Sequence, residues 1–160
     1  MYTAFTDRKN IIVGVNAGHG TKGGTSVKTW CHPDKTAKVT GGSTAADAQK
    51  AAAVSSGMSF RDGSSESSVT LREAILVRDF LLQEGYDVMM LRDGDDVKLD
   101  NIARTVICNN VADCHIAIHW DGDGLDYDKG CFYMSVEDGI KYLDSVATAF
   151  LCSYAWQRIF

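Results

Sequence analysis

The sequence predicts a single α/β domain: a largely parallel, twisted sheet flanked by helices. Short apolar runs typical of buried strands alternate with amphipathic helical patterns, an order that favours parallel strands joined by covering helices. The chain has 160 residues, of which 45% are hydrophobic, so it can bury one sizeable core. Its single proline and the absence of internal repeats argue against rigid linkers or a repeat architecture.

The first strand is predicted at residues 11–17, an apolar run rich in Ile and Val that is too short for a helix. The segment that follows, about 20–65, is rich in Gly, Ser and Thr and predicts a long insertion after this strand. Within it, the alanine-rich residues 45–54 favour one or two helical turns. Loops of this length usually have a function or lack order.

A helix is predicted over about 68–84, where Leu71 and Ile75 begin an apolar stripe and Gly85 is placed to end it. The next strand covers 86–91, before a charged turn.

A second amphipathic helix is predicted over about 98–110, where apolar residues recur at helical spacing. Strands are expected at 113–118 and 131–136. The apolar residues of the last segment predict a final helix: Ile140, Leu143, Val146, Ala147, Phe150 and Leu151. A strand normally follows such a helix, so either the helix closes the domain or part of the sheet is missing from this chain, and we expect the second.

Charge and composition exclude several classes of function. The net charge of −5 disfavours nucleic acid as a partner, because phosphate binding needs a basic face. No run approaches the roughly 20 apolar residues that span a membrane, and the first ten residues lack the apolar core of a secretory signal. The five cysteines contain no short C-x-x-C pair, so we expect small buried hydrophobes rather than a disulfide framework.

Three side chains are predicted to meet at one edge of the sheet. His19 follows the first strand, His119 ends the strand at 113–118, and Glu66 lies just ahead of the helix at 68–84. Carboxyl ends of strands and amino ends of the following helices share the ligand-binding edge of an open α/β sheet. Two imidazoles and one carboxylate are a ligand set of catalytic zinc, with a fourth position left for water.

Each of these residues also has a structural interpretation. Glu66 could simply favour the helix amino terminus through the dipole, an effect of about 0.3–1 kcal/mol. His119 could be a hydrogen-bonded histidine at a strand end. His19 lies between two glycines, which suit a tight turn rather than a core position. Their shared edge favours the zinc site, whereas His115 alternates with apolar residues and is interpreted as structural, or as a hydrogen-bond donor behind a ligand.

Six motifs occur in an order that resembles the zinc-dependent N-acetylmuramoyl-L-alanine amidases of the type 3 family. The motifs are GHG at 18–20, E-x-x-V-x-L at 66–71, G-Y-D-V at 85–88, L-R-D at 91–93, R-x-x-x-x-N at 104–109 and A-D-x-x-I-A-I-H at 112–119. The resemblance covers residues 11–136 with one large insertion. It implies that His19, Glu66 and His119 bind zinc. It also implies cleavage of the amide bond between the muramic acid lactyl group and the L-alanine of peptidoglycan.

The chain departs from the family pattern at several positions. Asn16 stands where the family usually has Asp, and Trp120 and Asp121 stand where it commonly has a small residue and Asn. The family's catalytic glutamate, on a later strand in an E-x-G-F-like context, has no counterpart before Phe160. The resemblance therefore implies one amidase-like zinc domain over residues 1–160, with its insertion at about 20–65, that is incomplete at its carboxyl terminus.

Three acidic residues are the candidates for the missing general base: Asp121, Asp123 and Glu137. Loop acids of this kind are more often simply exposed to solvent. Trp120, next to a proposed ligand, is the candidate for contact with the glycan–peptide substrate, since aromatic side chains beside a site often serve recognition.

The expected function is zinc-dependent hydrolysis of peptidoglycan. Two alternatives stay open: a non-catalytic, zinc-bearing module that binds the cell wall, and a zinc peptidase that cuts within the stem peptide. Because no secretory signal is evident, we expect either a phage-type lysis enzyme made in the cytoplasm or an excised catalytic domain that acts on the bacterial wall.

Overall fold

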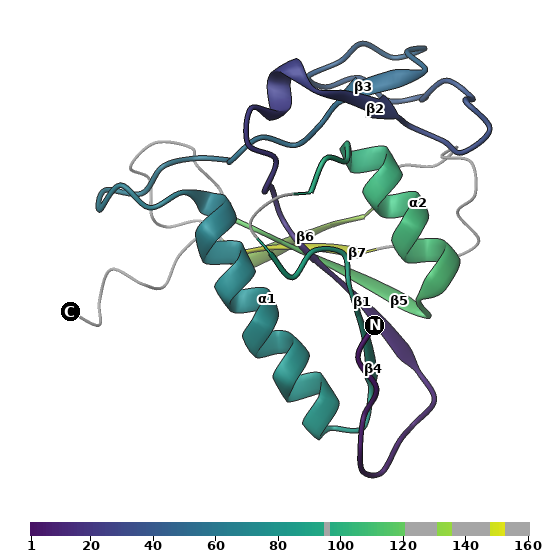
Figure 1. Cartoon of the computed structure of the whole chain (residues 1–160), viewed down its shortest axis with the longest axis vertical. Coiled ribbons are helices and arrows are strands. Elements are labelled where there is room, and N and C mark those ends of the chain that lie inside the picture. The colour runs from purple at the N-terminus through teal and green to yellow at the C-terminus, as the bar shows by residue number, and fades with distance from the viewer. Residues whose placement is uncertain (95–96, 121–130, 136–147, 153–160) are drawn as a thin grey trace.

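The computed structural model describes residues 1–94, 97–120, 131–135 and 148–152. Its centre is a five-stranded sheet with the strand order β4-β1-β5-β7-β6 (Figure 1). The strands are β1 Ile12–Ala17, β4 Asp87–Met90, β5 Cys114–His119, β6 Cys131–Ser135 and β7 Thr148–Cys152. All neighbours pair in parallel except β6, which is antiparallel to β7. The predicted α/β domain with a largely parallel sheet is confirmed.

Helix α1, Glu66–Gln83, covers one face of this sheet. Ser65 caps its amino end by accepting a hydrogen bond from the Ser68 backbone N–H. The buried core beneath α1 consists of Val13, Val15, Ala17, Ala74, Val88 and Ile118. Full burial of one such Val or Ile side chain stabilises the fold by about 1.5–3 kcal/mol. This packing fixes the first turn of α1 beside the carboxyl ends of β1 and β5.

Helix α2, Asn101–Val111, packs against β1 and β5 from the opposite face. Its amino end is capped by Asp100, which accepts hydrogen bonds from two backbone N–H groups. Gly14 faces this helix, and a Cβ atom there would lie 3.1 Å from Cβ of Ala112, just past the helix end. The glycine therefore allows the close approach of α2 to the sheet.

The segment between β1 and α1 forms a small antiparallel sheet of β2, Lys28–Trp30, and β3, Lys50–Ala52, after a short 3-10 helix at Gly24–Ser26. It lies beside the amino end of α2 (Figure 1), where Thr29 Oγ1 donates a hydrogen bond to Asp100. The predicted helical turns at 45–54 are wrong, because residues 50–52 are a strand. Ala51 pairs with Thr29 and is buried, so tertiary packing outweighs the helix propensity of alanine.

The predicted final helix is wrong at its carboxyl end. Phe150 and Leu151 belong to strand β7, which pairs in parallel with β5. A short apolar run suits a buried strand as well as a helix, and pairing with two neighbours satisfies the backbone of β7. Residues 140–147, where the helix was expected to begin, lie outside the described part of the chain.

Candidate metal centre

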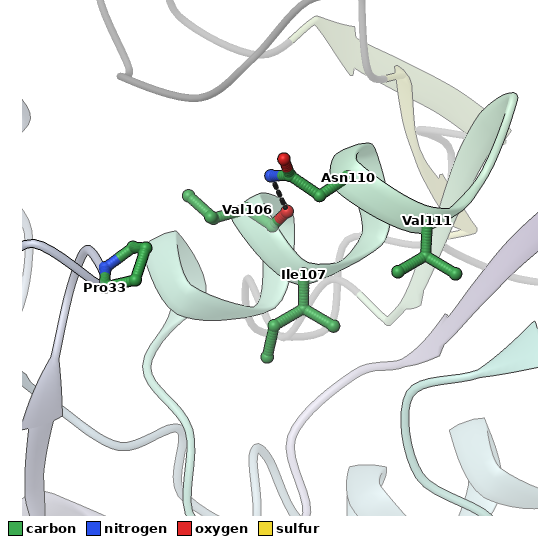
Figure 2. A pocket seen from close by; sticks show the side chains of 5 residues that line it. All are labelled: Pro33, Val106, Ile107, Asn110 and Val111. Carbon is green, nitrogen blue, oxygen red and sulfur yellow. Dashed lines mark hydrogen bonds between the residues drawn. The ribbon is translucent and has the colours of Figure 1, made fainter.

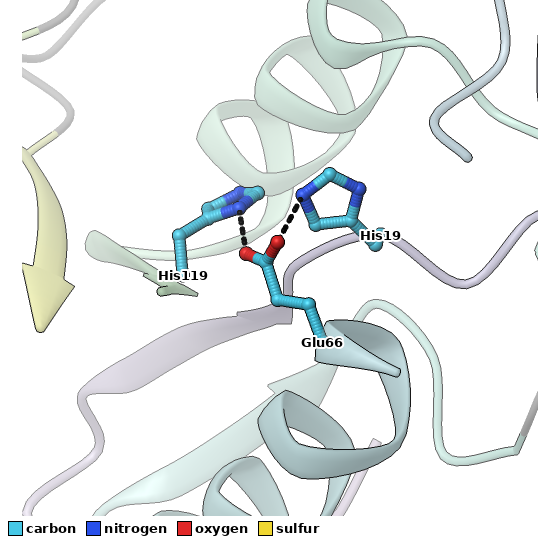
Figure 3. A group of neighbouring side chains, drawn as sticks. All are labelled: His19, Glu66 and His119. Atoms are coloured by element: carbon cyan, nitrogen blue, oxygen red, sulfur yellow. Dashed lines mark hydrogen bonds and ion pairs between the residues drawn. The ribbon is translucent and has the colours of Figure 1, made fainter. Parts of the chain in front are cut away.

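His19, Glu66 and His119 converge at one edge of the central sheet (Figure 3). His19 follows the end of β1, His119 is the last residue of β5, and Glu66 is the first residue of α1. Glu66 Oε2 lies 3.1 Å from His19 Nε2, and its Oε1 lies 3.2 Å from His119 Nδ1. The two imidazole rings meet edge to face, with centroids 4.9 Å apart.

The donor atoms of this group fit a zinc ion. Ligand atoms about 2.0 Å from one tetrahedral zinc lie about 3.3 Å from each other, which is close to both separations above. Two neutral imidazoles and a carboxylate are also the nitrogen and oxygen donors that zinc accepts at catalytic sites. The candidate ligand atoms of the three residues all lie within 4.8 Å of one another, so the group could hold one metal ion once they draw together to the tetrahedral separation.

The backbone at His19 adopts a left-handed conformation, with φ of 63°. Few residues other than glycine adopt this conformation, and it costs of order 1 kcal/mol or more unless the surroundings enforce it. Here Gly18 N–H donates to the Ile118 carbonyl, and the Thr70 hydroxyl donates to the Gly18 carbonyl. These bonds turn the chain sharply after β1 and direct the imidazole toward Glu66.

Arg92 links this turn to the first turn of α1. Its buried guanidinium donates to the carbonyl oxygens of Ala17 and Gly18, and also to that of Ser67, at 2.7–3.0 Å. One side chain thus connects the turn that carries His19 to the helix that carries Glu66. The sequence identified Arg92 only as part of the L-R-D motif. Its position just after a buried strand was the available signal that it lies near the site.

Glu66 is buried and its carboxylate is held on both oxygens. The Met58 backbone N–H donates to Oε2 at 3.1 Å, and the Trp120 backbone N–H donates to Oε1 at 2.9 Å. Burial alone raises the pKa of Glu66, but hydrogen bonds with His119 and His19, and the one from Trp120 N–H, outweigh it. The net pKa lies well below its usual range, so the group is an ionised carboxylate, as a metal ligand must be.

Two glycines leave the space that this group occupies. A Cβ atom on Gly57, whose φ is 80°, would lie 2.5 Å from Glu66 Oε2. A Cβ atom on Gly18 would lie 2.6 Å from the ring of His119. Gly18 belongs to a motif identified in the sequence, whereas Gly57 lies in the segment between β1 and α1 and was not singled out from sequence.

A family model for N-acetylmuramoyl-L-alanine amidases, Amidase_3, matches residues 13–146. The chain belongs to this amidase family. No curated protein sequence matches the chain.

Solved amidase structures share the fold of this amidase-family chain. Ami1 from Mycobacterium smegmatis is 19% identical, with a TM-score of 0.56, over 84% of this chain and 54% of that one. AmiC2 of Nostoc punctiforme is 20% identical, with a TM-score of 0.51, over 79% and 53%. The CwlD amidase from Clostridioides difficile, solved in complex with the GerS lipoprotein, is 12% identical, with a TM-score of 0.56, over 89% and 82%. The present chain spans about half the length of Ami1 and AmiC2.

The other predicted site residues of this amidase-family chain are distributed as follows. Trp120 is half-buried beside the His–Glu–His group, and its indole donates to Glu73. His115 is buried without a hydrogen-bond partner among the described residues, and burial lowers its pKa to about 4. His115 therefore contributes to packing as a neutral side chain. Asp121, Asp123 and Glu137 lie outside the described residues.

An apolar hollow on α2 is separate from the metal-binding group (Figure 2). Its volume is about 440 Å³, and none of the three candidate ligands lines it. The lining residues are Pro33, Val106, Ile107, Asn110 and Val111. Because the hollow offers no ionisable side chain, we place the chemistry at the sheet edge instead.

Within the described residues, no helix is long and apolar enough to cross a bilayer.

Proposed function

We propose that this chain is a zinc-dependent N-acetylmuramoyl-L-alanine amidase domain that acts on bacterial peptidoglycan. The bond cleaved is the amide between the muramic acid lactyl group and the L-alanine of the stem peptide. The observation that carries the proposal is the convergence of His19, Glu66 and His119, in a chain of this family, at separations that suit one ion. Residues 1–160 act in this proposal as one amidase-like zinc domain.

The donor set suits hydrolysis of an amide. Zinc bound there would supply a Lewis acid for the scissile carbonyl and would lower the pKa of an attacking water to about 7. Glu66 neutralises only part of a divalent charge, because the two imidazoles bind in neutral form. Burial of the Glu66 carboxylate limits competition from solvent, while His19 and His119 remain partly exposed, so a substrate can approach from their side.

Hydrolysis also needs a proton carrier for the water and for the leaving amine. Such general acid–base help accelerates reactions by about 10²–10⁴-fold. We propose Asp121, Asp123 or Glu137 for this role, since the first two closely follow His119 in the chain. Trp120, at the edge of the group, is proposed to contact the substrate.

The main alternative is a zinc-bearing module that binds the wall without cleaving it, since Glu137 lies in an E-x-G-I context and differs from the E-x-G-F-like context that the resemblance implies. Digestion of purified peptidoglycan by the zinc-loaded chain separates the functions. We expect new alanine amino termini, which the His119→Ala variant should not produce. Cleavage within the stem would indicate a zinc peptidase, and co-sedimentation without products would indicate a binding module; either result would overturn the proposal.

A further inference from the structure

Trp120 bridges two carboxylates of helix α1. Its backbone N–H donates to Glu66 Oε1 at 2.9 Å, and its indole Nε1–H donates to Glu73 Oε2 at 3.1 Å. Glu66 and Glu73 are seven residues apart, which is nearly two full helical turns, so they lie on the same side of α1. Trp120, the first residue after β5, is thereby hydrogen-bonded to the helix at two points.

Phe60 holds the same indole from another direction. The rings of Phe60 and Trp120 meet edge to face, with centroids 5.6 Å apart. The loop that carries Phe60 is itself closed by a hydrogen bond from Phe60 N–H to the Ser64 carbonyl, just before α1 begins. The indole is therefore confined by the helix and by the loop that leads into it.

Glu73 is the helix carboxylate that accepts the indole hydrogen bond. It is half-buried, and burial raises its pKa, an effect that the hydrogen bond from Trp120 partly offsets. A half-buried carboxylate loses solvation unless a donor replaces water. The indole N–H is that donor, and the contact requires Trp120 in the observed orientation.

We propose that Glu73 and Trp120 act together as positioning residues that orient Glu66 for metal binding. This inference rests on the metal site of the proposed function. The Trp120 N–H donates to Glu66 Oε1 while its indole is bonded to Glu73 and packed against Phe60, and Nδ1 of the adjacent His119 contacts the same oxygen.

Two substitutions remove the indole–carboxylate bond and little else. Trp120→Phe keeps the aromatic ring and the backbone N–H, and Glu73→Leu keeps the volume of the helix residue. Each should weaken zinc binding about tenfold, the lower end of the range for partners behind metal ligands. The double variant should bind zinc about as well as either single variant, because both remove one interaction. Glu73→Gln retains a carbonyl acceptor and should bind within about twofold of the wild type.

The experiment is an equilibrium zinc titration of the four variants, with Trp30→Phe and Glu84→Leu as controls at exposed positions. Zinc affinities of Trp120→Phe and Glu73→Leu that match the wild type, or that fall additively in the double variant, would overturn the proposal. The indole N–H resonance of Trp120 in metal-free protein gives a second readout. It should shift in Glu73→Leu even if the wild type were to bind no zinc, whereas an unchanged resonance would show that the bond is absent.

Discussion

Gly57 packs directly against the carboxylate of Glu66. A Cβ atom on Gly57 would lie 2.5 Å from Oε2 and 2.6 Å from Cβ of Glu66, and 2.9 Å from Cδ2 of His19. These distances are too short for any carbon contact, so a side chain at position 57 and the observed position of Glu66 exclude each other. The segment between β1 and α1 thus forms one wall of the metal-binding group.

Substitution Gly57→Ala should therefore weaken zinc binding about tenfold or more, because it displaces a ligand. Gly63→Ala is a matched control, since its φ of 84° is close to that of Gly57 but no atom lies within 4 Å of the added methyl group. Both variants should lose about 1 kcal/mol of stability from backbone strain alone. A competition titration against a chelator measures the difference, and equal zinc affinities in the two variants would contradict the packing described.

Arg92→Met should lower the free energy of unfolding by about 3 kcal/mol. Hydrogen bonds from a charged donor contribute about 1.5–3 kcal/mol each, and four carbonyl oxygens would lose this donor, so about 3 kcal/mol is the least loss we expect. Zinc affinity should fall as well, because the turn at His19 and the start of α1 lose their connection. Arg72→Met, at an exposed position of α1, should change stability by no more than about 0.5 kcal/mol in the same urea titration. Similar losses in both variants would show that Arg92 does not connect these segments.

His115 should make the folded state sensitive to acid. Burial lowers its pKa to about 4 from an ordinary value of 6.5, so the unfolded chain binds this proton at a pH where the folded chain does not. The free energy of unfolding should fall by about 3 kcal/mol through this residue as the pH drops from 7 to 4.

Urea titrations of metal-free protein at several pH values test this expectation. The His115→Leu variant should lose less stability over the same interval, because it has no buried imidazole to protonate. Parallel pH profiles for the variant and the wild type would show that His115 does not cause the sensitivity.

Asn16→Asp should stabilise the fold by giving Arg104 a carboxylate. The Arg104 guanidinium is buried and donates to Asn16 Oδ1 at 3.3 Å, while its Nη2 has no partner among the described residues. Burial and the nearby Arg92 lower the pKa of Arg104 to about 10, so it stays charged at neutral pH. We expect a gain of about 1 kcal/mol, since the solvation lost by the new carboxylate offsets most of the attraction.

The control for this prediction is the same substitution in an Arg104→Met background. There Asn16→Asp should reduce stability, because the buried carboxylate has no cation beside it. If urea unfolding showed the same change in both backgrounds, the substitution would be acting independently of Arg104.

The sequence was sufficient to predict the elements that carry the metal-binding group. The apolar runs before His19 and His119 and the helical pattern that follows Glu66 are local signals, and parallel strands end at a common edge. The predicted helix start at about 68 was late, because Glu66 is the first residue of α1. These signals depend on side-chain type and spacing alone. The convergence of the three residues could therefore be expected without knowledge of their contacts.

Features that depend on tertiary contacts were missed. Phe150 and Leu151 form a strand that pairs with β5 on one side and β6 on the other. The residue pattern within 140–151 does not reveal this pairing. Gly57 contacts His19 and Glu66, and Glu73 accepts a hydrogen bond from Trp120. Most of these partners lie far away along the chain. Their sequence surroundings resemble those of an ordinary loop glycine and an ordinary helix glutamate.

The most direct test of the account is the zinc content of the purified chain, measured by elemental analysis beside His19→Ala, Glu66→Ala and His119→Ala. We predict one zinc per wild-type chain and substantial loss in each variant, since each removes one of three protein ligands. A wild-type chain without zinc after reconstitution, or variants that retain it in full, would contradict the assignment of His19, Glu66 and His119 as a metal centre.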